Sequence, residues 1–463
     1  MQEEKTNNNT LDTYNTNSYN TNSTIMKTSA EKSSIVDEKP DTQQRSVKKQ
    51  VFISLSVLIL IILTTILVIM YGKGYRLFVQ HGEPTISNTG ILNLSSDPTG
   101  AQVFIDGHLT TATNNSLNLT PGKYSITIVK DGYLPWKKDF EVQKEVVSNA
   151  GATLYPQAPS LQSISTFGIQ SAIMDPTGTK LAFSIASSSA HENGIYVYDM
   201  TSRSFPILAG QSSTTQIVDD TTDKFSQAKI TWSPDGTQIL ATIAQTPDEP
   251  PTYYLLTAES FNQTPQDITA IYQNTLTLWQ QQRKDKEDAQ IKSLKPNVQK
   301  FAKNYFRILS WSPDDNSILY QASASASMPV FQKPRLIGDN YLYEQRVVEK
   351  GGIYVYNIAE DYNTRILEPI SNICTADDPT CNCEDFTTCE MPLTWLPDST
   401  HLLYVNDKKI NVIEDDGSNM TTLYAGPFVD HFVFPWPDGS KIVILTNLNS
   451  PNLPPTLYSI GLK

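Results

Sequence analysis

Residues 233–240 read Ser-Pro-Asp-Gly-Thr-Gln-Ile-Leu, and the chain repeats this turn-then-strand pattern four more times. The other copies are Asp175-Pro-Thr-Gly-Thr-Lys-Leu-Ala-Phe183, Ser312-Pro-Asp-Asp-Asn-Ser-Ile-Leu-Tyr320, Leu396-Pro-Asp-Ser-Thr-His-Leu-Leu-Tyr404 and Trp436-Pro-Asp-Gly-Ser-Lys-Ile-Val-Ile444. Proline fixes φ at the first turn position, an aspartate side chain caps the turn, and glycine supplies the positive φ that follows. A recurring turn followed by an apolar strand is typical of a radially repeated β architecture.

The turn residues themselves are expected to be structural. A carboxylate that stands in the same turn of every repeat does the same local work each time, whereas a calcium or general-acid site needs several groups that converge on one point. An earlier turn at Asp97-Pro-Thr-Gly100 has the same chemistry. The residues assigned to turns are Pro98, Gly100, Pro234, Asp235, Gly236, Pro313, Asp314, Pro397, Asp398, Pro437, Asp438 and Gly439.

The spacing of the repeats predicts a β-propeller over residues 157–463. The marker prolines stand at positions 176, 234, 313, 397 and 437, and only the last interval is close to one blade of about 40–45 residues. We therefore expect five blades, with six as the alternative, interrupted by insertions. A bulky residue precedes four of the turns, and the pattern resembles TolB-like and other WD-repeat-like propellers; these residues are Trp232, Trp311, Trp395 and Phe434.

The first readable insertion is residues 266–294, which we predict to be helical. Apolar side chains recur there at helical spacing and a charged run follows them, up to Pro296. The apolar residues are Ile268, Ile271, Tyr272, Leu276 and Trp279. We expect this face to pack on the propeller, because an exposed stripe of that size is a liability. A partner-binding arm is the alternative.

The second insertion contains all four cysteines of the chain, within residues 374–389. They are Cys374, Cys381, Cys383 and Cys389. Zinc sites usually pair cysteines two to four residues apart, and the spacing here differs, so we expect no metal site. Two disulfides that staple a loop are the preferred interpretation. Joining Cys381 to Cys383 would be strained across a single intervening residue, which leaves two pairings open.

Residues 89–156 form a compact β unit. Apolar residues alternate with polar ones in two runs, which predicts half-buried strands: Ala101, Val103 and Ile105, then Tyr124, Ile126 and Ile128. The stretch Pro98-Thr-Gly-Ala-Gln-Val-Phe-Ile-Asp-Gly107 resembles the signature of PEGA domains, with Thr99 where the family has Glu, and the resemblance continues at Leu119-Thr-Pro-Gly-Lys-Tyr124 and Val129-Lys-Asp-Gly-Tyr133. It implies a small extracellular β-sandwich of bacterial surface proteins, either a spacer or a carbohydrate-facing module, without catalytic residues to carry over.

The N-terminal part predicts a membrane anchor. Residues 1–47 are rich in Asn, Thr and Ser and should be a disordered tail. Residues 48–71 are expected to form a transmembrane helix, because Val51 to Met70 carry no charge and span roughly 30 Å. Residues 72–88 would link it to the β unit. Three basic residues precede the span and two follow it, which favours a cytoplasmic tail and an extracytoplasmic body.

The net charge and the absence of catalytic motifs from the sequence narrow the range of possible functions. The net charge of −13 argues against nucleic acid as a partner. The sequence has no nucleophile elbow, zinc-protease motif, phosphate loop or dinucleotide fingerprint, so we expect neither enzymatic activity nor a cofactor. The sequence thus predicts a membrane-anchored binding or scaffolding protein of the bacterial cell envelope, with a cell-wall glycan or an envelope protein as partner. A hydrolase or lyase that acts on envelope polysaccharide in the propeller channel is the alternative.

Overall fold

The structure is a computed structural model, and it divides into two compact units, Met1–Val68 and Ile69–Lys463, which are described separately. The described residues are 43–72, 75–80, 83–165, 167–186, 189–201, 213–244, 250–369, 393–429, 432–448, 450 and 453–463. The expected tail therefore lies outside the described residues for nearly all of its length. The cysteine loop, with Cys374, Cys381, Cys383 and Cys389, lies outside them entirely.

A single long apolar helix occupies the described part of the N-terminal region. This helix, α1, runs from Gln43 to Gly72. From Lys49 onward it is long and apolar enough to cross a membrane, by length and composition. It is followed by a hairpin of β1 (Tyr75–Gln80) and β2 (Glu83–Asn88), in which Tyr75 pairs with Asn88.

The next segment is a two-layer β-sandwich, as predicted. One sheet has the order β6-β3-β9 and the other the order β5-β4-β7-β8. The strands are β3 (Gly90–Asp97), β4 (Gln102–Ile105), β5 (His108–Ala112), β6 (Asn115–Leu119), β7 (Gly122–Val129), β8 (Trp136–Val142) and β9 (Val147–Thr153). Strands β3 and β9 are parallel, and the other pairs are antiparallel. The alternating side chains of Val103, Ile126 and Ile128 are fully buried between the layers.

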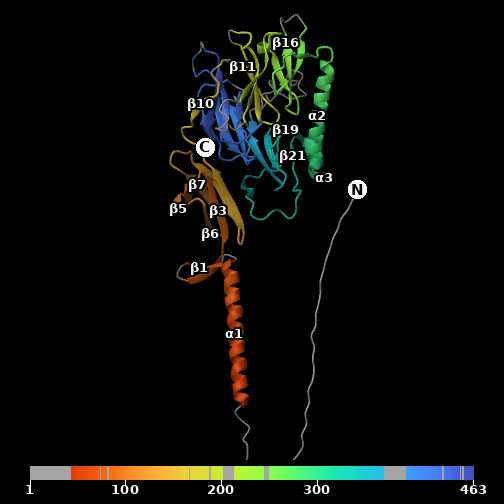
Figure 1. Ribbon diagram of the computed structural model, residues 1–463. Helices are drawn as coiled ribbons and strands as arrows, with labels where there is room; N and C mark the ends of the chain where they lie inside the picture. The colour runs from red at the N-terminus through yellow and green to blue at the C-terminus, as the bar shows by residue number, and fades with distance from the viewer. Residues whose placement is uncertain are drawn as a thin grey trace, which may run out of the picture. The chain divides into compact units, whose positions relative to one another are not determined.

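Five four-stranded sheets follow in the described part of the chain after residue 160. The first four sheets use strands close in sequence, each hydrogen-bonded to the next in an antiparallel meander (Figure 1). They comprise β11 (Ile169–Met174), β12 (Lys180–Ile185), β13 (Gly194–Asp199) and β14 (Thr214–Asp219); β15 (Lys229–Trp232), β16 (Gln238–Ile243), β17 (Thr252–Thr257) and β18 (Gln266–Asp267); β19 (Phe306–Trp311), β20 (Ser317–Ala322), β23 (Ile353–Asn357) and β24 (Tyr362–Leu367); and β25 (Leu393–Trp395), β26 (His401–Asn406), β27 (Lys409–Glu414) and β28 (Thr421–Tyr424). The short strands β21 (Ala326–Ser327) and β22 (Val347–Val348) form a separate ribbon within the third sheet's connection.

The fifth sheet is built from both ends of this region. It contains β29 (Val433–Pro435), β30 (Lys441–Thr446) and β31 (Thr456–Gly461), and β31 also pairs with β10 (Leu161–Ser163). A sheet that takes strands from the start and the end of a repeat array closes the array into a ring, and this leaves only short edges. Together with the five sheets, this closure identifies the predicted propeller.

Apolar clusters join four of the five neighbouring pairs of sheets. The first and second sheets share a cluster that includes Ile195, Trp232 and Ile239. Comparable clusters join the third sheet to the fourth, the fourth to the fifth and the fifth to the first. These sheet-to-sheet contacts bury large aliphatic and aromatic side chains, and their burial is the main source of stability in the ring.

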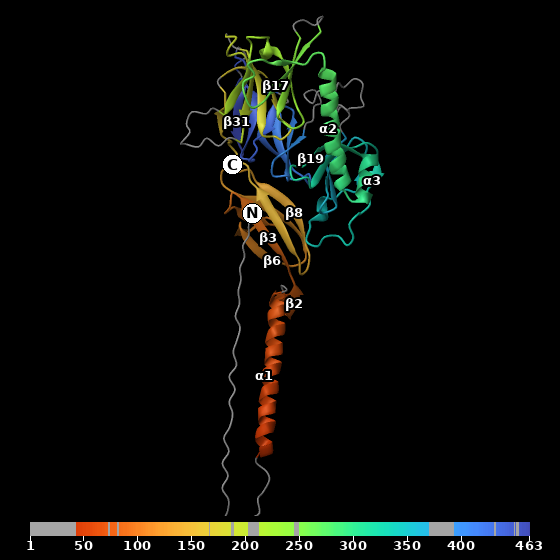
Figure 2. The same ribbon diagram turned by 45° about the vertical axis from the view of Figure 1, so that its right-hand side comes forward.

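A pair of helices stands between the second and third sheets instead. Trp279 of α2 (Tyr272–Ser293) packs on the second sheet, and Phe301 of α3 (Pro296–Tyr305) packs on the third. Figure 2 shows α2 alongside β17 and β19. The prediction had ended the helical segment before Pro296, but proline at a first helical position favours a helix start, and here Pro296 begins α3. The residues expected to start the insertion, Gln266 and Asp267, belong to strand β18.

Candidate functional site

A cluster of charged side chains lies where the sandwich meets the propeller. Lys138 of β8 places its Nζ 2.7 Å from Glu414 Oε2 and 2.5 Å from Asp416 Oδ2. Glu414 ends β27, and Asp416 is in the turn that follows it. Burial disfavours the charged ammonium group, but the two carboxylates outweigh this and raise the pKa of Lys138 above its ordinary value. Lys138 is therefore a cation shared by two propeller carboxylates.

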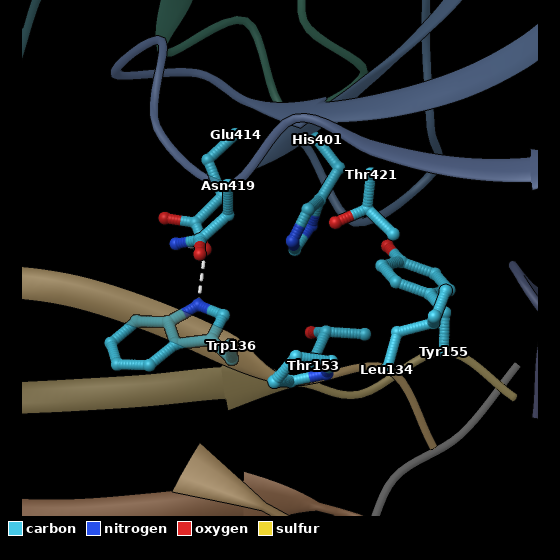
Figure 3. A pocket seen from close by; sticks show the side chains of 9 residues that line it. Leu134, Trp136, Thr153, Tyr155, His401, Glu414, Asn419 and Thr421 are labelled. Carbon is cyan, nitrogen blue, oxygen red and sulfur yellow. Dashed lines mark hydrogen bonds between the residues drawn. The ribbon is translucent and has the colours of Figure 1, made fainter. Parts of the chain in front are cut away.

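Glu414 is the centre of this junction. Its Oε1 accepts hydrogen bonds from the indole Nε1 of Trp136 and, at 3.0 Å, from Asn419 Nδ2, and its Oε2 accepts one from Ser418 Oγ at 3.1 Å. Asn419 in turn accepts the backbone N–H of Lys137 at 2.8 Å. Figure 3 shows the Trp136 indole directed at Glu414 from the sandwich side. A buried carboxylate with this number of donors is held in one orientation.

A histidine–aspartate pair also belongs to this junction. His401 Nδ1 lies 2.7 Å from Oδ2 of Asp398, the aspartate of the fourth repeated turn. Burial acts to lower the pKa of His401, but its hydrogen bond with Asp398 and the surrounding carboxylates raise that pKa above the ordinary histidine value. Burial also raises the pKa of the Asp415 carboxyl to about 7; the charges of Asp416 and Glu414 add to this shift, whereas Lys138 opposes it. The junction therefore contains one carboxyl group whose pKa lies near neutral pH, Asp415, and a histidine whose pKa is raised.

A small cavity lies between these groups. Its lining residues come from both the sandwich and the propeller: Leu134, Pro135, Trp136, Thr153, Tyr155, His401, Glu414, Asn419 and Thr421. It has room for about one water molecule. The Tyr155 ring meets the His401 ring edge-on at 6.0 Å, and its buried hydroxyl has no hydrogen-bond partner in the described chain. The cavity can therefore hold water against Tyr155, and it is too small for a sugar or an organic cofactor.

A second contact joins the sandwich to the propeller through the backbone of Asp139 in β8. The segment 328–346 connects β21 to β22 and contains the short helix η3 (Tyr341–Tyr343). Asn340 Nδ2 donates to the backbone oxygen of Asp139 at 2.8 Å, and the backbone N–H of Asp139 donates to the Tyr343 hydroxyl at 3.0 Å. Strand β8 is thus held by polar groups from two separate segments of the propeller, residues 340–343 and 414–419.

The residues assigned to turns lie apart from this junction, with one exception. Each repeat aspartate accepts bonds from its own turn: Asp235 from Thr237, Asp314 from Asn316, Asp398 from Thr400 and Asp438 from Ser440. Glycine has positive φ in three of the repeated turns, whereas Asp315 and Ser399 take that conformation in the other two. In the earlier turn, Pro98 precedes Gly100, which also has positive φ. Asp398 alone reaches the junction, through His401.

No local pattern in the sequence indicates the junction residues. Lys138 lies in a run rich in charged residues, Lys137-Lys-Asp-Phe-Glu141, of the kind that solvated strands carry, and Glu414 to Gly417 has the composition of a solvated turn. In the described residues, no group of three or more His, Cys, Asp or Glu side chains is arranged to hold a metal ion. Chemically, the junction can hold two domains together and respond to pH.

Comparison with known proteins directly supports the assignment of the sandwich domain. Residues 89–157 match the family model described as PEGA domain, which confirms the resemblance drawn from the sequence. Among solved structures, a putative TolB from Agrobacterium tumefaciens is 14% identical with a TM-score of 0.21, over 63% of this chain and 78% of that one. TolB from Acinetobacter baumannii is 11% identical with a TM-score of 0.20, over 73% of this chain and 59% of that one. None of the curated proteins matches the sequence.

Proposed function

We propose that this chain is a membrane-anchored, extracytoplasmic binding or scaffolding protein of a bacterial cell envelope, in which the sandwich is a stalk and the propeller presents the binding surface. The domains in this proposal are a tail at 1–47, a span at 48–71, a linker at 72–88, the sandwich at 89–156 and the propeller at 157–463. The apolar composition of α1 supports the anchor. The basic residues on its N-terminal side support a cytoplasmic tail.

The observation that carries the proposal is the double attachment of β8. The ion pairs of Lys138 and the hydrogen bonds of Asp139 fix the sandwich to two separate parts of the propeller. A flexible tether would need no such contacts, and interfaces between domains of one chain allow movement unless specific contacts oppose it. A stalk that is fixed to its head holds the head at a constant orientation, which suits presentation of a surface to a large, immobile partner.

The partner class in this proposal is a cell-wall glycan or an envelope protein, bound by the propeller loops. Loops around a propeller are variable in length and exposed, and they are the usual place for recognition residues. The cysteine loop at 374–389 is one such insertion, and two disulfides there would make it stiff. The cavity at the junction has room for about one water molecule, so it is too small to take part in this binding.

Anchoring and orientation are tested first, with the full chain in intact cells. Epitope tags would be placed before Met1 and after Lys463. We expect the chain to stay in the membrane after alkaline extraction, and external protease to remove the C-terminal tag while the N-terminal tag survives. Release by alkali would overturn the anchor. Loss of the N-terminal tag alone would show that the topology is the opposite of the one proposed.

Binding is tested with purified peptidoglycan sacculi and the full chain in detergent. We expect co-sedimentation that saturates, and a weaker effect in a variant whose residues 374–389 are replaced by a Gly-Ser linker. Unchanged binding in that variant would remove the cysteine loop from recognition. Release of soluble sugar from the sacculi would instead favour the hydrolase or lyase, and absence of any binding would leave an envelope protein, to be sought by crosslinking, as the partner.

A further inference from the structure

The segment 328–346 presents an exposed apolar tip. Ile337 at its end is 77% exposed, the highest value among large hydrophobic residues in the described part of the chain after α1, and its neighbour Leu336 is 41% exposed. Val147, at the start of β9, is 52% exposed. We call Leu336, Ile337 and Val147 the apolar tip. Single exposed aliphatic residues are common, but a group of three contributed by two domains needs an explanation.

The tip is held rigidly. The Asp361 carboxylate, which is 2% exposed, accepts the backbone N–H groups of Phe331 at 2.7 Å and Gln332 at 2.9 Å. Arg335 forms a two-pronged ion pair with Glu344 across the base of the loop. A loop fixed in this way has already lost its conformational entropy, so contact through the tip costs less ordering than contact through a mobile loop.

The tip lies on the sandwich. Gly338 has a φ of +99°, and a Cβ atom at this position would lie 2.6 Å from the backbone oxygen of Val147. Only glycine permits this approach, which brings Ile337 beside the first residue of β9. Figures 1 and 2 both show the segment between β21 and η3 next to the sandwich strands. The propeller loop and the sandwich therefore form the tip together.

The chain that leads to this end of the sandwich is short. Val147 pairs with Ile91 of β3, and β3 begins at Gly90. The hairpin pairs Tyr75 with Asn88 at its base, so its strands add almost no length between α1 and β3. At about 3.6 Å per residue and about 5 Å across the pair, the chain reaches at most roughly 25 Å from Gly72 to Gly90. The chain length therefore limits how far the sandwich end that carries Val147 can lie from the end of α1.

The charges around the tip differ from those of the whole chain. Lys144 and Lys333 are exposed, and in the sequence they stand shortly before Val147 and Leu336 respectively, while the chain has a net charge of −13. Of the acidic neighbours in sequence, Glu145 is exposed and Asp339 accepts a hydrogen bond from the Tyr341 hydroxyl at 3.1 Å. Aliphatic side chains flanked by lysines are the composition of segments that lie in the interfacial layer of a bilayer, where lysine reaches the phosphates.

We propose that the apolar tip inserts into the interfacial layer of the membrane that α1 crosses, so that the occupant of this surface is lipid. The proposal rests on α1 being a membrane anchor. Tethering keeps the tip at high effective concentration near the lipid, so three aliphatic side chains suffice for contact that would be weak for a free protein. The contact would fix the tilt of the stalk and propeller relative to the membrane.

The test uses the full chain in proteoliposomes of phosphatidylethanolamine and phosphatidylglycerol, with a photo-crosslinking residue at one position at a time. Ile337→p-benzoyl-phenylalanine should form adducts with lipid on illumination. Leu278→p-benzoyl-phenylalanine is the matched control, since Leu278 on α2 is 57% exposed and belongs to the helical insertion. Its lipid adducts should be at least tenfold fewer.

A third position separates the proposal from its premise. Leu60→p-benzoyl-phenylalanine, in the middle of α1, reports whether the helix lies in lipid. Lipid adducts at positions 60 and 337 support the tip contact. Lipid adducts at position 60 without lipid adducts at position 337 would contradict the tip contact and leave the anchor in place. Adducts at position 337 that join two copies of the chain would likewise contradict the tip contact. Absence of lipid adducts at 60 overturns both the anchor and the tip.

Discussion

The propeller makes two kinds of contact, and they differ in chemistry. Its sheets meet one another through apolar clusters, such as the one that surrounds Phe225 and Ile239 between the first two sheets. It meets the sandwich through the ion pairs of Lys138 with Glu414 and Asp416 and through hydrogen bonds, beside an apolar contact made by Leu134 and Tyr155. Burial of apolar side chains does not depend on the protonation of any group, whereas ion pairs weaken when either partner titrates and when salt screens their charges. The contacts between sheets should therefore be little affected by pH, and the junction is where a change of pH should alter the stability of the molecule.

The largest effect is expected from breaking an apolar contact. Phe225 is fully buried, and its ring lies 4.9 Å from that of Tyr254. Phe225→Ala should lower the free energy of unfolding by about 3–5 kcal/mol, because the cavity cannot collapse between two sheets. Denaturant unfolding of the full chain in detergent measures it. Phe261→Ala is the control, since Phe261 is 43% exposed and should cost less than about 1 kcal/mol. Equal losses would contradict the assigned role of this cluster.

The next effect is expected at the ion pairs of the junction. Lys138→Met leaves Glu414 and Asp416 close together without their cation, and it should cost about 2–3 kcal/mol, somewhat less than a fully buried pair because the Lys138 side chain is 15% exposed. The loss should be local. Hydrogen exchange should accelerate in β8 and in residues 414–419 while the propeller sheets stay protected.

The neighbouring lysine provides the control for this change. Lys137 is exposed and contributes only its backbone N–H to Asn419 in the described contacts. Lys137→Met should therefore leave the exchange rates of β8 unchanged. Equal acceleration in the two variants would mean that net charge, and not the shared cation, holds the junction.

The two kinds of contact also differ in how far the sequence predicted them. The alternation of Val103, Ile126 and Ile128 predicted the sandwich because burial on one face imposes period two. The five repeated turns predicted the sheets because each turn needs the same few residues. The pairing of β10 with β31 was not predicted, since it joins residues some three hundred positions apart. The junction was missed for the same reason, because Lys138 and Glu414 each have the local pattern of a solvated residue.

The two kinds of contact should also differ in how their stability depends on pH. Asp415 has a pKa raised by burial to about 7, above that of an unfolded aspartate, so the folded chain takes up this proton first. Its contribution to stability is present at acidic pH and is lost as the pH rises through about 7. His401, whose pKa is also raised, acts in the same direction. The junction should therefore loosen on the order of 1 kcal/mol between pH 5.5 and 8.

Asp415→Asn separates this titration from the rest of the molecule. The amide keeps the size of the side chain and carries no charge at any pH, so the variant should lose most of the pH dependence of exchange in residues 414–419. The clusters between the sheets contain no group of this kind among their core residues, and their protection should be flat over the same range in both proteins. A wild-type junction that tightens between pH 5.5 and 8 would contradict the assigned direction.

The smallest effect tests whether the second attachment of β8 acts independently of the ion pairs. Tyr343→Phe removes the hydroxyl that accepts the Asp139 N–H at 3.0 Å, which should cost about 1 kcal/mol and raise the exchange rate of that amide about fivefold. Tyr124→Phe is the control, because the Tyr124 hydroxyl bonds to Thr120 within the sandwich. If the attachments are independent, combining Tyr343→Phe with Lys138→Met should give the sum of the single losses. A combined loss well above that sum would mean that either attachment alone keeps β8 in place, so that the sandwich separates from the propeller only when both are weakened.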